Sequence, residues 1–160
     1  MEGYNIRHLT EKDLKTLQDF SGKYMKPDEI VIFHWIVQHN LSYAIIDSDT
    51  KKWIGYMIIY PIPCDEQVLY DLSSLVKKYP TVKTAQRFKS LFLHDIRVTK
   101  EKYYNVIWRK LEFLYYSIGY TRIYMYNALA NDTNTYKIWT GELGFTENDA
   151  TYIYKTICRN

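Results

Sequence analysis

The sequence predicts an α/β fold built on a mixed sheet, and two patterns support this prediction. Segments rich in β-branched and aromatic residues alternate with segments in which apolar residues recur every three or four positions. Two of the β-rich segments flank a short polar turn, which is typical of an antiparallel hairpin. The chain has 160 residues and no internal repeat or long linker, so we expect one domain over residues 1–160.

The first part of the chain is expected to form a strand and two helices. A strand over residues 4–9 precedes Thr10, which is a good helix N-cap, and Asp13 can act as its capping partner. Apolar residues at helical spacing follow, and Gly22 is a plausible stop. Pro27 then opens a second helix with one apolar face.

The clearest hairpin consists of strands over residues 42–47 and 53–60, joined by a polar turn. Gly55 in the second strand marks a bulge or a close approach of another chain segment. Pro61 and Pro63 are expected to end that strand.

The second half of the chain alternates helices with strands. Helices are expected over residues 65–78, from the turn at 99–103 to Gly119, and over residues 132–140; strands are expected over residues 88–98, 122–126 and 150–157. In the longest of these helices, apolar residues at i, i+4, i+7 and i+11 predict one buried face, formed by Ile107, Leu111, Leu114 and Ile118.

Composition and charge argue against several classes of protein. Apolar residues make up 47% of the chain and charged residues 24%, which favours a globular protein over a disordered one. The formal net charge of +3 is too small to indicate nucleic-acid binding. No apolar run is long enough to span a membrane, and no signal peptide is expected.

The cysteines and histidines do not predict a metal site. Cys64 and Cys158 are too few for a disulfide scaffold and are expected to be reduced thiols in a cytoplasmic protein. His34 and His39 on the second helix are five residues apart, which does not match a helical zinc pair. They are expected to be structural or to line an acceptor pocket.

Three segments, in this order and spacing, resemble the GNAT (GCN5-related N-acetyltransferase) fold. They are the opening YNIRHLTEKDLKTL, the strand LFLHDIRV that runs into a helix, and NDTNTYKIWTGELGF before the last strand. The resemblance covers essentially the whole chain. It implies a twisted, mostly antiparallel mixed sheet with helices on both faces, a splayed pair of central strands, and acetyl-CoA as co-substrate.

In this family acetyl-CoA lies between the splayed strands, which here match residues 88–98 and 122–126. The resemblance implies that backbone groups near Ile96 and Val98 pair with the pantetheine arm. The start of the next helix would hold the pyrophosphate, since its free N–H groups and dipole favour an anion. The full set expected to bind the cofactor is Ile96, Val98, Lys102, Tyr103, Tyr104, Asn105, Val106, Ile107, Trp108, Asn131 and Asn134.

The segment that matches the family's phosphate-binding loop is divergent. The family has Gln or Arg, two residues, Gly, one residue, then Gly or Ala, but Val106 and Trp108 occupy the two small positions here. Glycine lets the backbone approach phosphates without a Cβ in the way, so the amides are usable only if these side chains point elsewhere. The nearby basic residues either compensate CoA phosphates or form a solvated face; they are Lys100, Lys102, Arg109 and Lys110.

His94 and Asp95, in the middle of the strand over 88–98, are the candidates for the base that accepts the amine proton. Strand alternation predicts that they lie on opposite faces, His94 with Ile96 and Val98, so that only one can face the site. Each also has a structural interpretation, His94 as a hydrogen-bonded core histidine and Asp95 as the partner of a basic residue.

The residue at the position of the family's usual acid, which protonates the departing thiolate, is also not a tyrosine. Many family members carry a tyrosine four residues before the Gly of a Gly-Phe pair, and that position is Thr140 here, a far poorer acid. Tyr136, one turn earlier, is the candidate acid, with a structural tyrosine as the alternative in a chain that has 17 tyrosines.

Two functions remain open from the sequence. The favoured one is an N-acetyltransferase that moves an acetyl group from acetyl-CoA to an amine of unknown acceptor by direct attack. The alternative is a catalytically inactive GNAT-fold module for binding or regulation, which the missing glycines and Thr140 favour. The expected partners are acetyl-CoA and an amine acceptor, without nucleic acid or membrane, and a homodimer remains open.

Overall fold

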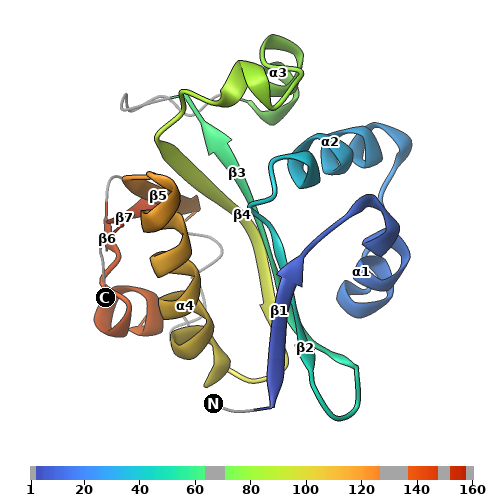
Figure 1. The fold of residues 1–160 in the computed structure, drawn as a ribbon, viewed down its shortest axis with the longest axis vertical. Helices are drawn as coiled ribbons and strands as arrows, with labels where there is room; N and C mark the ends of the chain where they lie inside the picture. Colours follow the sequence, from blue (N-terminus) through green and yellow to red (C-terminus); the bar gives the residue numbers. More distant parts are fainter. Residues whose placement is uncertain (1–2, 64–70, 127–136, 148–151, 158–160) are drawn as a thin grey trace.

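A seven-stranded sheet organises the protein (Figure 1). The computed structural model describes residues 3–63, 71–126, 137–147 and 152–157. The strand order is β1-β2-β3-β4-β5-β7-β6, and every neighbouring pair is antiparallel except β4 with β5. The strands are β1 (Tyr4–His8), β2 (Tyr43–Asp47), β3 (Trp53–Ile62), β4 (Ser90–Val98), β5 (Arg122–Tyr126), β6 (Thr146–Glu147) and β7 (Tyr152–Thr156). The mixed, mostly antiparallel sheet expected from the sequence is confirmed.

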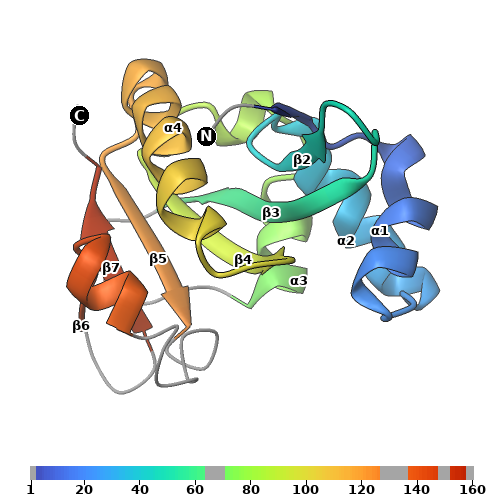
Figure 2. The ribbon, with the colours of Figure 1, turned by 90° about the horizontal axis from the view of Figure 1, so that it is seen from below.

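Helices cover both faces of the sheet, as Figures 1 and 2 show. They are α1 (Leu14–Ser21), α2 (Pro27–Gln38), α3 (Leu72–Lys78) and α4 (Tyr103–Ile118), with short 3₁₀ turns at η1 (Glu11–Asp13) and η2 (Lys83–Ala85) and the π-helical segment η4 (Ile138–Glu142). Side chains of α4 and η4 share one apolar core with the sheet, and those of α1, α2 and α3 share the other.

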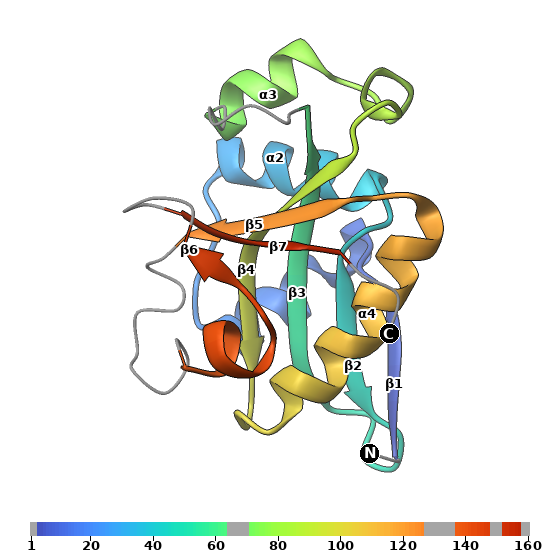
Figure 3. The ribbon, with the colours of Figure 1, turned by 90° about the vertical axis from the view of Figure 1, so that its left-hand side faces the viewer.

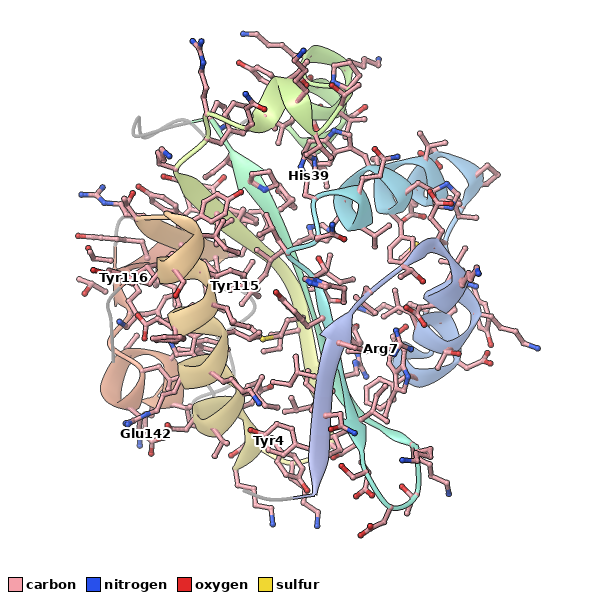
Figure 4. All side chains as sticks on the ribbon, viewed as in Figure 1. Tyr4, Arg7, His39, Tyr115, Tyr116 and Glu142 are labelled. Atoms are coloured by element: carbon pink, nitrogen blue, oxygen red, sulfur yellow. The ribbon has the colours of Figure 1, made fainter. Side chains whose placement is uncertain are left out.

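The N-terminal segment forms as predicted. The Thr10 N–H donates to the Asp13 carboxylate at 2.8 Å, which caps the first turn. Gly22 ends α1 in the left-handed conformation, with φ of 72°, and its N–H donates to the Gln18 carbonyl. Arg7, which points from β1 toward α1 in Figure 4, ties the strand to this turn through both oxygens of Asp13.

Gly55 lies where β3 approaches β4 most closely. A Cβ at this position would lie 2.5 Å from the Arg97 carbonyl oxygen and 2.9 Å from the Val98 Cγ1. The pairing of β2 with β3 also shifts by one residue next to Gly55. Both parts of the prediction for this glycine, a bulge and a close approach, are therefore confirmed.

Two of the predicted boundaries are wrong, and one strand was not predicted. β3 continues through Pro61. Its pairing with β2 ends at Met57, so on that side the proline, which has no N–H, is not required to donate a hydrogen bond to a neighbouring strand. The helix expected from residue 65 begins at Leu72 after the N-cap Asp71, with residues 64–70 outside the described part. The short strand β6 was not expected at all.

The buried face of α4 is also shifted from the prediction. Tyr115 is fully buried and its hydroxyl donates to the Leu41 carbonyl at 2.7 Å, whereas Ile118 is 59% exposed. Ile107, Leu111 and Tyr115 are spaced by four residues, so the stripe drifts around the helix and leaves Ile118 outside it. Figure 4 shows Tyr115 directed toward the sheet and Tyr116 directed away.

β4 and β5 run side by side at one end and then separate. They are paired only from Ser90 opposite Arg122 to Leu93 opposite Met125. Figures 2 and 3 show that β5 then crosses the direction of β4 while β4 continues along β3. The splayed pair of central strands expected from the sequence is confirmed.

Candidate functional site

A β-bulge in β4 turns two adjacent ionisable residues toward the same side of the sheet. Two consecutive residues of β3 lie opposite Asp95 and Leu93, so His94 is the extra residue. Both His94 and Asp95 consequently face the side covered by α1 and α2. Ile96 and Val98 instead pack against the core beneath α4. The prediction that His94 shares a face with Ile96 and Val98, and that only one of the two ionisable residues faces the site, is wrong.

Asp95 is held by a tyrosine rather than by a basic residue. The Tyr56 hydroxyl donates to Asp95 Oδ2 at 2.7 Å. Burial and this carboxylate raise the pKa of Tyr56, so the hydroxyl stays protonated as a donor. Within the described part of the chain, none of the ion pairs includes Asp95.

His94 packs against Tyr60, with 5.9 Å between the ring centroids. The His94 side chain is accessible to solvent. Desolvation by the surrounding protein still lowers the pKa of His94, and the charge of Asp95 opposes this shift in part. The imidazole is therefore neutral near pH 7 and has a lone pair that can accept a proton.

A cavity of about 410 Å³ opens beside His94 and Asp95. Side chains from α1, α2, β3 and the segment between the two helices form its wall. Most of the wall is apolar or aromatic, including Met25, Ile32, Phe33, Ile36, Tyr56 and Ile58. The helical spacing had predicted the apolar face of α2, but not that part of it would line a cavity with residues of β3.

The other side of β4 is open at the same level. Because pairing with β5 stops at Leu93, the backbone from His94 to Val98 has no β5 partner among the described residues. Ile96 and Val98, both expected to bind the cofactor, lie in this stretch and are partly buried against the core under α4.

α4 begins shortly after β4, and two bulky residues of its second turn point into the protein. Ile107 and Trp108 are buried in the core, and the Trp108 ring packs against Trp139 and Phe145. The N–H groups of Tyr103 and Tyr104 donate to the carbonyls of Lys100 and Glu101, at 3.1 Å each. Those two amides are thus already used by the turn that leads into the helix. Val106 is half-buried.

A second hollow, of about 380 Å³, lies between the start of α4 and η4. It brings together Lys102 and Asn105, which were predicted to bind the cofactor, with Lys137, which was not. The carboxylates Glu101 and Glu142 line the same hollow. Of the other basic residues near this turn, Lys110 lies over the Tyr4 ring at 5.7 Å, and Lys100 and Arg109 are exposed. Figure 4 shows Tyr4 and Glu142 on either side of the N-terminal end of α4.

Several solved structures with this architecture are acetyltransferases, and one is the C-terminal condensation domain of Ebony. The chain is similar to the mosquito arylalkylamine N-acetyltransferase-like protein 5b (TM-score 0.63, 13% identity, covering 96% of this chain and 99% of the other). It is also similar to a Drosophila melanogaster polyamine N-acetyltransferase (TM-score 0.62, 7% identity, 98% and 100%) and to a Vibrio fischeri ribosomal-protein-S5-alanine acetyltransferase (TM-score 0.64, 10% identity, 98% and 94%). This chain has the GNAT fold. No protein-family model and no curated protein sequence matches it.

Some residues that the GNAT resemblance singled out lie outside the described part. They are the candidate acid Tyr136, the expected cofactor residues Asn131 and Asn134, and the cysteines Cys64 and Cys158. Thr140 is described and lies in η4. Their roles stay predictions, as do those of the other expected site residues.

The two histidines of the second helix do not line the cavity. His34 lies 3.9 Å from the Glu11 carboxylate at the surface. His39 caps the end of α2 and packs edge-on against Trp35. These contacts favour the structural interpretation of both histidines over a place in the cavity wall.

Within this GNAT fold, the described residues contain no cluster of three or more histidine, cysteine, aspartate or glutamate side chains arranged to hold a metal ion. No helix among them has the length and apolar character needed to cross a bilayer. The polar side chains that line the cavity include His94, Asp95 and Tyr56, with Lys23 and Glu29 from the side of the helices.

Proposed function

We propose that this protein is an acetyl-CoA-dependent N-acetyltransferase that acts on an amine. The observation that carries the proposal is the position of His94. The pairing of β4 with β5 ends at Leu93, directly before His94. His94 is itself the bulged residue of β4, and it lines the 410 Å³ cavity. A thioester lying along the open edge and an amine lying in the cavity would meet there.

Acetyl-CoA would lie along the open edge of β4. The backbone near Ile96 and Val98 would pair with its pantetheine arm, and Lys102, Asn105 and Lys137 around the hollow would face its phosphates. The phosphate-binding loop is proposed to be divergent. The buried Trp108 keeps its bulk out of the phosphate side, while two amides of the turn are already bonded, so the lysines would carry more of the binding.

The chemistry needs a proton acceptor close to the amine. An amine reaches neutral pH as an ammonium ion and must lose a proton before its nitrogen attacks the thioester carbonyl. Neutral His94, or Asp95, would accept this proton. The carbon–sulfur bond then breaks, and the CoA thiolate takes a proton, for which Tyr136 is the proposed donor.

The reactions named for the similar solved structures support the class of reaction but not one acceptor. They concern an arylalkylamine, a polyamine and the alanine of a ribosomal protein, and what these share is N-acetylation. An inactive binding module remains the alternative, and nothing in the cavity or the open strand edge favours it.

The first test is calorimetric titration of the protein with acetyl-CoA and with CoA. We expect a Kd in the micromolar range, equivalent to about −8 kcal/mol. The double variant Lys102→Glu/Lys137→Glu should weaken binding at least about tenfold, since it reverses two charges beside the phosphates. Lys52→Glu, an equivalent exchange in the exposed turn before β3, is the matched control.

The second test is release of free CoA thiol in the presence of a panel of amines. His94→Gln should slow the reaction by roughly 10²-fold or more if His94 is the base. A folded protein that binds no acetyl-CoA would overturn the proposed function.

A further inference from the structure

We propose that the cavity beside His94 selects a primary amine carried on a compact apolar or aromatic body, and that Asp95 receives its ammonium group. This inference rests on the proposed function, of which it names the acceptor class.

The wall of the cavity suits an apolar body. The almost fully buried Phe33, Ile36 and Ile58 line the cavity, together with the partly buried Met25 and Ile32. A volume of about 410 Å³ is near the lower end of the range for small-molecule pockets, which are mostly apolar with a few placed polar groups. Burial of an aromatic or branched aliphatic group against these side chains would drive binding.

The charge in the cavity suits one ammonium group. Asp95 is half-buried, and Tyr56 donates to only one of its two oxygens. No ion pair in the described residues includes Asp95, although Arg97 lies near the Tyr56 hydroxyl. The charged residues that line the cavity are Lys23, Glu29 and Asp95, which leaves one negative charge in excess. Such a charge is costly unless it is paired, and an ammonium group from a ligand supplies the pairing.

The remaining ionisable groups argue against a ligand with several positive charges. Glu29 is exposed and already accepts the Lys26 N–H at the start of α2, at 3.1 Å. Lys23 lines the same cavity and would repel a second cation. One ammonium beside Asp95, with the rest of the molecule apolar, fits this arrangement better than a polyamine does.

The position of Asp95 also fits the chemistry. His94 precedes it in the chain and, because of the bulge, faces the same cavity. An ammonium held by Asp95 therefore lies close to a neutral imidazole that can accept its proton. Asp95 is assigned as the residue that binds the acceptor, and His94 as the base.

Binding of four probes to the CoA-saturated protein by calorimetry tests the inference. The probes are 2-phenylethylamine, its uncharged analogue 2-phenylethanol, spermidine, and a tetrapeptide with an N-terminal alanine. We expect 2-phenylethylamine to bind at least about tenfold more tightly than each of the others, because a charge-assisted hydrogen bond has about this effect.

Two variants with matched controls locate the binding. Asp95→Asn should remove the preference for the amine over the alcohol, whereas Asp28→Asn, an exposed carboxylate on α2 outside the cavity, should keep it. Ile32→Trp should fill the cavity and abolish binding of both aromatic probes. Val31→Trp, one position away and 61% exposed, should leave binding intact.

The outcomes separate this inference from the proposed function. Equal affinity for the amine and the alcohol, tighter binding of spermidine or the peptide, or no binding of any probe to a protein that binds acetyl-CoA would each overturn the assigned acceptor class alone. Failure to bind acetyl-CoA would instead overturn the proposed function, and probe binding is then measured on the free protein.

Discussion

The Lys155 ammonium contacts Glu112 Oε2 at 2.5 Å, and this ion pair joins β7 to the inner side of α4. Glu112 is only 1% exposed, although it lies on the helix that covers the core. The pair therefore lies largely out of water, where an unpaired charge is costly.

Removal of one charge of this pair is expected to be costly. Glu112→Gln should lower the free energy of unfolding by about 3 kcal/mol, because Lys155, whose side chain is only 13% exposed, loses the carboxylate that pairs with its charge. Urea denaturation followed by circular dichroism measures the change. The double variant Glu112→Leu/Lys155→Met is the control, and it should be nearly as stable as the wild type; a double variant as unstable as the single one would contradict this account.

The close approach at Gly55 predicts a local conflict. Gly55→Ala places a methyl group 2.5 Å from the Arg97 carbonyl oxygen, so β4 must shift, and overpacking of this kind costs about 1–3 kcal/mol. Thermal unfolding measures the loss. Gly141→Ala is the matched control, since a Cβ there meets nothing within 4 Å, and its effect should be neutral or stabilising. Equal effects of the two substitutions would rule out the steric explanation.

His39 predicts a loss of stability in mild acid. Burial lowers the pKa of His39 to about 4 from an ordinary value of 6.5. Because the folded state disfavours the proton, the stabilising contribution is complete above pH 6.5 and is lost as the pH falls from 6.5 toward 4. The loss from this residue is at most about 3 kcal/mol.

Denaturation at pH 7.5, 6 and 5 measures this loss. His39→Phe keeps the edge-on contact with Trp35 but cannot be protonated, so it should lose clearly less stability than the wild type over this range. Some loss will remain, since desolvation also lowers the pKa of His94. An unchanged pH profile in His39→Phe would show that His39 is not responsible.

Asp13 predicts a second acid transition at lower pH. The hydrogen bonds from Arg7 hold the pKa of this carboxylate below its ordinary value of 3.8. Its contribution is therefore present above pH 3.8 and is lost as the pH falls further, through the folded-state pKa. Arg7→Lys, which removes the bidentate geometry, should cost about 1 kcal/mol at pH 7, since the guanidinium is half exposed. The same comparison near pH 2 should show little difference between variant and wild type.

The sequence predicted the elements around the site but not how their side chains are directed. The strand that carries His94 and Asp95 follows from its β-rich composition. Its bulge depends on the pairing of β4 with β3, and nothing in the alternation of residues 88–98 reveals one extra residue. The cavity could not be predicted for the same reason, because Tyr56 and Phe33 come together only when β3 and α2 pack.

Helix α4 shows a second limit of the same kind. Its spacing predicted Ile107 and Leu111 in the core, which is confirmed. Hydropathy alone favoured Ile118 over Tyr115, but the Tyr115 hydroxyl finds the Leu41 carbonyl and can be buried at little cost. A polar atom with a distant partner cannot be recognised from local sequence.

The short pairing of β4 with β5 has a mechanical consequence. In the described sheet, four residue pairs, from Ser90 with Arg122 to Leu93 with Met125, join the β1–β4 half to the β5–β7–β6 half. The Thr121 N–H adds a hydrogen bond to the Lys89 carbonyl just before them. A force that separates the two halves of the sheet would therefore act mainly on this short stretch of β4–β5 pairing. A molecule lying along the unpaired edge of β4 would connect the two halves beyond this stretch and make the whole sheet more rigid.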